Sequence, residues 1–316
     1  MDSNAQPRRV WIIGCGDVGC RLALRLHSIG VSVLGFVRSA ASASALERLA
    51  IVAQEWDLDD TDPKIRTAAA RGTAPDWIFY FAPPPNVGVT ETRLRAFLAA
   101  RDEPPKRLIY LSTSAVYGDC AGAWIDETAP TQPQNDRGRR RLDGEHAALA
   151  YAARTGCSAL ILRVPGIYGP GRLPVARLRA GTPVLRNEES PYTNRIHADD
   201  LAAAALHVAE YGAAGAAYNV SDGQPTTMTD YFLRCADLLS LAPPPQISLI
   251  EARSRLSPML MSFLEESRLL DTRRLVETLG WRAQYRDLAS GLPTCLAADV
   301  VAETLHASQA QAVAAQ

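Results

Sequence analysis

Short runs of hydrophobic residues alternate with stretches of helical periodicity through the first half of the chain. The runs predict buried strands at residues 10–13, 32–37, 51–56, 77–81, 107–112 and 159–164. Between them, apolar residues spaced three or four apart predict helices at residues 18–29, 41–50, 93–100 and 141–155. Strands that are apolar throughout and separated by helices predict an α/β fold with a doubly wound parallel sheet.

Composition narrows the class of protein. The 316 residues are 47% hydrophobic, which is enough to bury one large core, or one large domain and a small lobe. The net charge of -1 shows no excess of basic residues. We therefore expect no nucleic-acid partner and no membrane partner, and no apolar stretch reaches the ~20 residues of a membrane helix. Residues 1–7 are polar, without the apolar core of a signal peptide, and the six cysteines form no Cys-x-x-Cys pair. These features predict a cytoplasmic protein without a metal site.

A glycine motif follows the first predicted strand and opens the first predicted helix. It reads Gly14-Cys15-Gly16-Asp17-Val18-Gly19. Gly14 permits the tight turn, Gly16 lets the backbone approach a pyrophosphate, and Gly19 lets helix and strand pack closely. The helix N-terminus adds free N–H groups and partial positive charge for the anion. In this position the motif predicts a Rossmann-type fold that binds a nicotinamide dinucleotide.

The second half of the sequence has a different composition. Proline and glycine become frequent after residue 165, with helices predicted at 199–211 and 227–239 and a strand at 217–220. We predict a Rossmann domain from residues 1–165 and 196–221, and a smaller C-terminal substrate lobe from 166–195 and 222–300. The Ala/Gln-rich residues 301–316 are expected to fray.

The end of the second strand indicates which coenzyme binds. Enzymes that use NAD place Asp or Glu there for the ribose hydroxyls, whereas this chain has Arg38 and Ser39 and no carboxylate before Glu47. A guanidinium suits a 2′-phosphate, so NADP(H) is preferred over NAD(H). Asp57 follows the third strand and has two interpretations, a contact to the adenine amino group or the cap of a local turn.

Five later segments, in order, resemble the extended short-chain dehydrogenases/reductases, the group that contains nucleotide-sugar epimerases and dehydratases. They are 111–118 (LSTSAVYG), 126–130 (DETAP), 162–171 (LRVPGIYGPG), 195–202 (RIHADDLA) and 218–221 (YNVS). The resemblance implies that Thr113 holds a substrate oxygen and that Ala82, Pro83, Pro165 and Ile167 lie beside the cofactor. It also implies a small-molecule substrate, and a homodimer through helices 93–100 and 141–155 is one expectation.

The chain departs from this group where the proton donor should be. The group uses a Tyr-x-x-x-Lys pair, but aligning Glu145 with the glutamate of that helix puts Arg137 at the tyrosine position and Arg141 at the lysine position. Arginine stays protonated near neutrality and cannot transfer a proton. Arg141 can still hold ribose hydroxyls. The chain thus resembles an atypical member that keeps the cofactor site and lacks the catalytic pair.

Other residues could reach the substrate. Glu127 lies in a loop that resembles a substrate-contacting loop of the group, and it could act as an acid or base if it is buried. Tyr192, Asn194 and Arg195 lie in the predicted lobe, where they could contact the substrate. Tyr117 and Tyr168 are expected to shape the pocket, and His197 to stand at a helix start.

Two functions remain open. The favoured one is an NADP-dependent oxidoreductase, epimerase or dehydratase that acts on a small polar or sugar-like substrate. The alternative is a non-catalytic NADP(H)-binding sensor or partner-binding protein, which the loss of the tyrosine favours.

Overall fold

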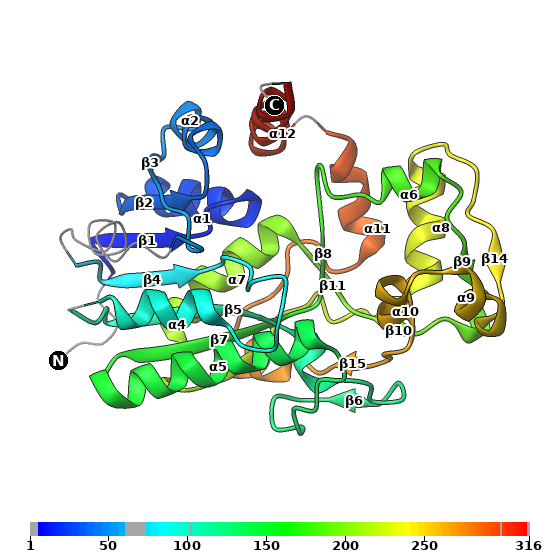
Figure 1. Cartoon of the computed structure of the whole chain (residues 1–316), viewed down its shortest axis with the longest axis horizontal. Coiled ribbons are helices and arrows are strands. Elements are labelled where there is room, and N and C mark those ends of the chain that lie inside the picture. The colour runs from blue at the N-terminus through cyan, green and yellow to red at the C-terminus, as the bar shows by residue number, and fades with distance from the viewer. Residues whose placement is uncertain (1–5, 61–73, 102, 298, 315–316) are drawn as a thin grey trace.

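The computed structural model describes residues 6–60, 74–101, 103–297 and 299–314. Its centre is a seven-stranded parallel sheet in the order β3-β2-β1-β4-β5-β7-β12 (Figure 1). The strands are β1 (Arg9–Ile13), β2 (Ser32–Val37), β3 (Val52–Glu55), β4 (Trp77–Tyr80), β5 (Arg107–Thr113), β7 (Ser158–Val164) and β12 (Ala217–Asn219). The predicted doubly wound α/β fold is confirmed.

Helices cover both faces of this sheet because alternate strand residues point to opposite sides. In β1, Val10 and Ile12 pack on one side and Trp11 and Ile13 on the other. The first side is covered by α1 (Asp17–Ser28), α2 (Ala40–Arg48) and α7 (Ala198–Tyr211). The second is covered by α4 (Thr92–Ala99) and α5 (Asp136–Thr155). Burial on both faces explains why the strands are almost continuously apolar.

Helix α5 begins five residues before the predicted start at residue 141, so that boundary was wrong. Asn135 is the N-cap, and its side chain accepts a hydrogen bond from the N–H of Gly138 at 2.9 Å. The polar run 136–141 hides the apolar periodicity of the helix, but the cap satisfies one of the first-turn amides and so starts the helix. The earlier start places Arg137 and Arg140 on the helix, beside Arg141.

The lobe lies beyond the carboxyl ends of the strands, at the right of Figure 1. Tyr168, Leu178, Tyr231 and Phe232 belong to a core of its own. Its longer elements are α6 (Val175–Arg179), α8 (Met228–Leu238), α9 (Leu249–Arg255), α10 (Pro258–Leu264) and α11 (Leu288–Gly291). Its short pairs are β8 (Gly166–Tyr168) with β11 (Arg195–His197), β9 (Val184–Leu185) with β14 (Gln246–Ile247), β10 (Tyr192–Thr193) with β13 (Thr226–Thr227), and β6 (Trp124–Ile125) with β15 (Leu269–Leu270).

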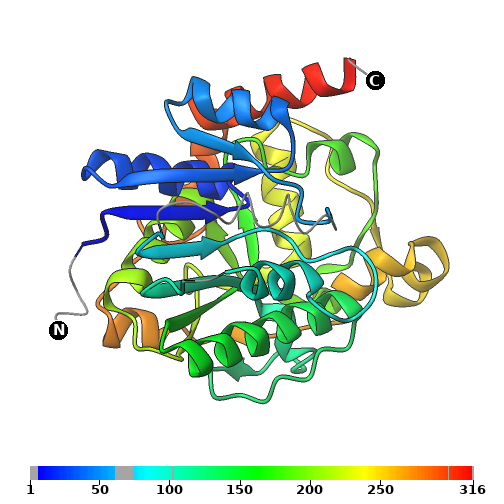
Figure 2. The same cartoon turned by 60° about the vertical axis from the view of Figure 1, so that its left-hand side comes forward.

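The Ala/Gln-rich end, expected to fray, is a helix in the structure. Helix α12 (Val300–Ala314) lies over α2 (Figure 2), and Val301 is buried. The first five residues of the predicted Rossmann domain and the last two of the tail lie outside the described residues.

Within the described ranges, no single helix is long and apolar enough to cross a membrane. The bent pair Leu288–Leu296 and Val300–Ala307 meets that length and composition test only when the two are taken together.

Candidate active site

The glycine turn after β1 has two differently constrained positions. Gly14 has φ +83°, and a Cβ there would stand 2.4 Å from the backbone nitrogen of Ala82. A Cβ at Gly16 would meet nothing within 4 Å. The fold therefore requires glycine at Gly14, whereas at Gly16 the backbone borders open space of the kind a closely approaching diphosphate needs.

The N-terminus of α1 faces the same space. Gly16 is its N-cap and no side chain caps it, so the first-turn amides remain available to an anion. The side chain of Cys15 is buried in the core, which leaves only its backbone at the turn. The Asp17 carboxylate pairs with Arg21 at 2.7 Å and with Arg172. Sequence reasoning missed Arg172, which comes from the loop after β8 and brings positive charge to this turn.

The predicted coenzyme-selecting residues stand at the end of β2. Arg38 is exposed, and Ser39 caps α2 by accepting the N–H of Ser42 at 3.3 Å. The Asp57 side chain accepts a hydrogen bond from the N–H of Asp59 at 3.0 Å. This is the geometry expected if Asp57 caps a local turn. The glycine turn, Arg38 and Asp57 follow the carboxyl ends of three neighbouring strands, where dinucleotides bind in such sheets.

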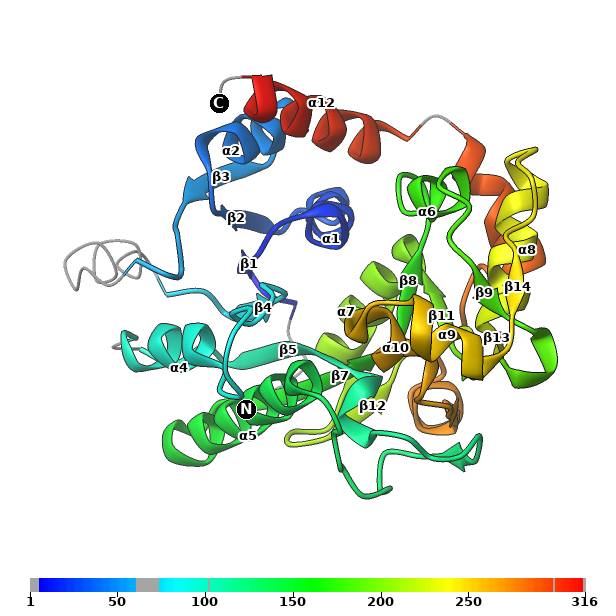
Figure 3. The same cartoon turned by 45° about the vertical axis from the view of Figure 1, so that its right-hand side comes forward.

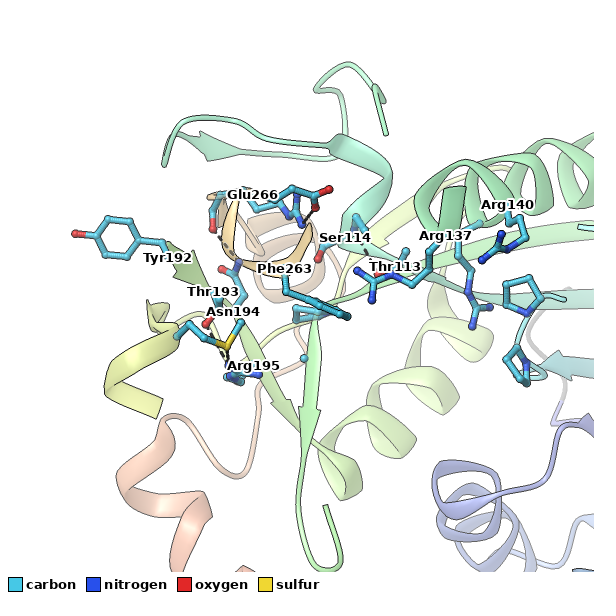
Figure 4. Close-up of a pocket in the computed structure, with 18 of the residues that line it drawn as sticks. Thr113, Ser114, Arg137, Arg140, Tyr192, Thr193, Asn194, Arg195, Phe263 and Glu266 are labelled. Carbon is cyan, nitrogen blue, oxygen red and sulfur yellow. Dashed lines mark hydrogen bonds and ion pairs between the residues drawn. The ribbon is translucent and has the colours of Figure 1, made fainter. Parts of the chain in front are cut away.

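A cavity of about 440 Å³ lies between α5, the carboxyl ends of β4 and β5, and the lobe (Figure 4). Its predicted members are Pro83, Thr113, Arg137, Arg141, Pro165, Tyr192, Asn194 and Arg195. The residues that the sequence did not single out are Pro84, Pro85, Asn86, Ser114, Ala115, Arg140, Gly166, Thr193, Met228, Phe263, Glu266 and Arg268. Because Ala82 contacts Gly14 and the next residue, Pro83, lines the cavity, the loop after β4 joins the glycine turn to the cavity.

Thr113 and three arginines form the α5 side of the cavity. Thr113 ends β5, and its Oγ1 accepts the N–H of Ala115 at 3.3 Å. Arg141 donates to the carbonyl oxygen of Leu111 at 2.6 Å, and the Arg137 guanidinium lies 3.9 Å over the ring of Phe263. Arg140 donates to the carbonyl oxygen of Gly88 at 2.5 Å. Hydroxyl and guanidinium groups in this arrangement can stabilise an oxyanion.

No lysine–tyrosine pair is present among the described lining residues. The chain has two lysines. Lys106 precedes β5, at the opposite end of that strand from Thr113, and pairs with Asp76; Lys64 lies outside the described residues. Tyr192 is the one lining tyrosine of the described part, and Figure 4 shows its ring directed away from Thr113 and Arg137.

Several candidate residues do not line the cavity. Glu127 is buried, and its carboxylate accepts the N–H of Asn219 at 2.7 Å. The Tyr117 hydroxyl donates to Asn219 at 2.8 Å and the Tyr168 hydroxyl to the carbonyl oxygen of Asp287 at 3.3 Å. His197 is buried and caps α7 by accepting the N–H of Asp199. Ile167, on β8, packs against the main core. These side chains support the walls.

The lobe contributes a single carboxylate to the cavity, counting described residues. Glu266 accepts from Asn135 at 2.7 Å and from Arg268 at 2.6 Å, which joins the segment after α10 to the start of α5. No local sequence pattern marks Phe263, Glu266 or Arg268, because they reach the cavity only through tertiary folding.

A buried network holds α5 against the sheet. Glu145 accepts from Ser112 on β5 at 2.5 Å and pairs with Arg163 on β7 at 2.8 Å. Arg163 also donates to the Tyr117 hydroxyl at 3.0 Å. The network fixes the rotation of α5 and hence the positions of Arg141 and Arg137, which lie one and two turns before Glu145.

The family model described as "NAD dependent epimerase/dehydratase family" matches residues 10–221. This chain belongs to that family. The match runs from β1 past the end of β12, so it includes the glycine turn and Thr113, and the resemblance seen in the sequence is confirmed at the level of the family.

Several known proteins resemble this chain over most of its length. Protein YeeZ of Escherichia coli strain K12 is 28% identical over 294 residues, which cover 89% of this chain and 97% of the relative. A solved conserved protein of unknown function from Silicibacter pomeroyi is 27% identical with a TM-score of 0.73, covering 91% and 97% of the two chains. MoeE5 in complex with UDP-glucose and NAD has a TM-score of 0.70 at 23% identity, covering 95% and 99%. This last similarity shows the fold alone.

Proposed function

We propose that this family member is an NADP(H)-dependent oxidoreductase, of the epimerase/dehydratase type, that acts on a small polar substrate in the cavity. The observation that carries the proposal is the position of the Thr113 hydroxyl in the cavity wall, at the carboxyl end of β5. The loop that follows β4 leads from the glycine turn to the same cavity. A dinucleotide that begins at this turn therefore extends toward Thr113.

The bound nicotinamide supplies or accepts a hydride at a substrate carbon. This transfer changes the negative charge on the oxygen attached to that carbon. An oriented hydroxyl and neighbouring cations stabilise that charge. Thr113 would donate its hydroxyl hydrogen to that oxygen, Arg137 would place its guanidinium beside it, and Arg141 would hold ribose hydroxyls. Arginine cannot take part in the proton transfer. Glu266 replaces Glu127 as the candidate for the proton transfer, because it is the one residue with a carboxylate among the described lining residues.

The first test measures turnover. NADPH oxidation at 340 nm is followed across a panel of carbonyl compounds and nucleotide sugars. With a substrate identified, Thr113→Val is expected to lower kcat/KM about 100-fold, since one preorganised donor contributes about that factor. Glu266→Gln is expected to remove one limb of the pH profile of kcat. A Thr113→Val variant as active as wild type would contradict the role of Thr113.

The second test concerns the coenzyme. Arg38 and Ser39 follow β2 without a carboxylate, and we propose that they hold the 2′-phosphate. Arg38→Ala is expected to weaken NADPH binding about tenfold and to leave NADH binding nearly unchanged. Calorimetry with both coenzymes measures this ratio, and Arg48→Ala on α2 is the control. Equal weakening of both coenzymes would contradict the selection of NADP(H) by Arg38.

The alternative is an NADP(H)-binding protein without turnover. The observation that favours it is Arg137, which is stacked on Phe263 where the family resemblance implies a tyrosine. Tight NADPH binding together with no oxidation across the substrate panel would support this alternative.

A further inference from the structure

The cavity carries an excess of positive charge. Among the described residues, five guanidinium groups line it, those of Arg137, Arg140, Arg141, Arg195 and Arg268, against the single carboxylate of Glu266. Arg268 is paired with Glu266 at 2.6 Å. Within the described part of the chain, no carboxylate oxygen lies within 4.0 Å of the other four guanidinium groups. Four cations thus face one cavity in a chain whose net charge is -1.

Two buried arginines elsewhere in this protein are neutralised by carboxylates. Arg21 is 5% exposed and contacts Asp17, Asp199 and Asp299. Arg163 is 8% exposed and is paired with Glu145. Desolvating a buried cation that has no paired carboxylate costs several kcal/mol, and an anionic ligand would offset this cost for the buried Arg140 and Arg195.

Arg195 marks the lobe end of the cavity. It is 8% exposed, and its guanidinium carbon lies 3.8 Å over the ring of Tyr231. Its guanidinium makes two long hydrogen bonds, to the Thr193 hydroxyl and to the Met228 sulfur, at 3.4 Å each. Its Nε has no hydrogen-bond partner. A Cβ on Gly166 would stand 2.3 Å from Nη1, so this glycine makes room for the guanidinium.

Arg137 and Arg140 mark the opposite end, beside Thr113. Figure 4 shows them on the α5 side of the cavity and Arg195 on the β11 side, with Phe263 between them. Arg140 is 8% exposed, and its Nε has no partner. Burial lowers the pKa of Arg137; the charge of Glu266 opposes this, and those of Arg268, Arg140 and Arg141 add to it. The two ends hold separate clusters of donors.

We propose that the cavity binds a small ligand with two separate anionic groups, one held by Arg137 and Arg140 beside Thr113 and the other by Arg195. This proposal rests on the proposed function, in which the same cavity receives the substrate. It adds that the reacting end of the substrate carries a carboxylate or phosphoryl group. Guanidinium groups match both anions with paired N–H donors.

The experiment measures binding by calorimetry at low ionic strength, first without coenzyme and then with saturating NADPH. The probes, termed dianions for their two anionic groups, are 2-oxoglutarate, with two carboxylates, and 3-phosphoglycerate, with a carboxylate and a phosphoryl group. Acetate and glucose are the monoanionic and neutral comparisons. At least one dianion is expected to bind about tenfold or more tightly than acetate, and glucose not at all. The preferred dianion distinguishes a carboxylate from a phosphoryl group.

Variants locate the two ends. Arg137→Gln and Arg195→Gln are each expected to lower dianion affinity about tenfold, to the level of acetate. Arg139→Gln is the matched control, because Arg139 is exposed on the same helix and paired with Asp136. If Arg195→Gln does not fold, Arg137→Gln decides the test, since its side chain is half-buried.

Three results would overturn the inference. They are dianions that bind no better than acetate, an Arg137→Gln variant that binds them as wild type does, and displacement of the dianions by NADPH. Each can occur while NADPH binding and turnover of a neutral substrate remain intact. Conversely, dianion binding without NADPH binding would contradict the proposed function alone.

Discussion

At the residue scale, the two glycines of the turn after β1 separate the needs of the fold from those of the coenzyme. Gly16 has φ -84° and ψ -151°, an extended conformation with negative φ, and its Cβ position is open. Gly16→Ala is therefore expected to change the free energy of unfolding by less than about 1 kcal/mol. The methyl group would occupy the space of the diphosphate, so the Kd for NADPH should rise about tenfold or more.

Gly14→Ala serves as the comparison. Its φ of +83° and the close backbone of Ala82 predict a loss of about 2 kcal/mol or more in stability. Urea unfolding and calorimetry on both variants test the pair. A Gly16→Ala variant that binds NADPH like wild type would show that the diphosphate lies elsewhere.

Asp222 gives a pH-dependent prediction at the same scale. Burial raises its pKa to about 7, aided by Asp287 and Asp200 and opposed by the N–H of Gln224 and by Arg195. Its Oδ2 has no hydrogen-bond partner. As the pH rises, the Asp222 carboxyl of the unfolded chain, with a pKa of about 3.9, loses its proton at a lower pH than that of the folded protein. Stability from this group is therefore complete below about pH 4 and decreases as the pH rises toward 7.

Asp222→Asn mimics the protonated form at every pH. Its unfolding free energy relative to wild type should increase by up to about 1.4 kcal/mol per pH unit between pH 4 and 7. Urea titrations at several pH values measure this difference. A constant difference across that range would mean that Asp222 ionises normally in the folded protein.

At the scale of elements, α5 depends on one buried carboxylate. Glu145 joins β5 through Ser112 and β7 through Arg163. Glu145→Gln leaves the buried Arg163 without its anion, so a loss of about 3–5 kcal/mol is expected. The control is Asp136→Asn at the exposed start of the same helix, where the pair with Arg139 should contribute less than about 1 kcal/mol. Denaturant unfolding of both variants compares them, and equal losses would refute the anchoring role of Glu145.

The sequence predicts the long elements well and the short ones poorly. The inner strands of the main sheet are buried on both faces and α1 has a clear apolar stripe, so local periodicity is sufficient there. The strand pairs of the lobe are two or three residues long, and no periodicity exists over such lengths. The start of α5 was misplaced because its first turn is charged and only the Asn135 cap marks it.

The candidate site likewise contains residues that the sequence predicts and residues that it does not. Gly14, Gly16 and Thr113 follow strand ends, and their positions are fixed by the parallel sheet, so the sequence identifies them. Phe263, Glu266 and Arg268 come from more than 100 residues beyond α5 and have no signature of their own. Glu127 was expected to contact substrate, but the structure directs its carboxylate to the N–H of Asn219. Only the tertiary structure distinguishes these cases.

At the scale of the whole molecule, α12 connects parts that are distant in the sequence. Figure 3 shows it extending from above the lobe side to α2. Asp299, just before it, makes two hydrogen bonds to Arg21 of α1 at 2.9 and 3.0 Å, and Arg48 of α2 donates to the carbonyl oxygen of Thr304 at 3.3 Å. Val301 is 3% exposed. The chain end thus braces the helices that follow the glycine turn.

A chain that ends at residue 297 is therefore expected to lose stability. It loses the burial of Val301 and one of the three carboxylates around Arg21, so the free energy of unfolding should fall by about 3–5 kcal/mol. A chain that ends at residue 308 keeps these contacts and should stay within about 1 kcal/mol of the full chain. Urea unfolding of the three chains, with NADPH affinity as a second readout, decides whether α12 is a structural element or a dispensable tail. If both truncations match the full chain, the contacts of α12 with α1 and α2 do not stabilise the fold.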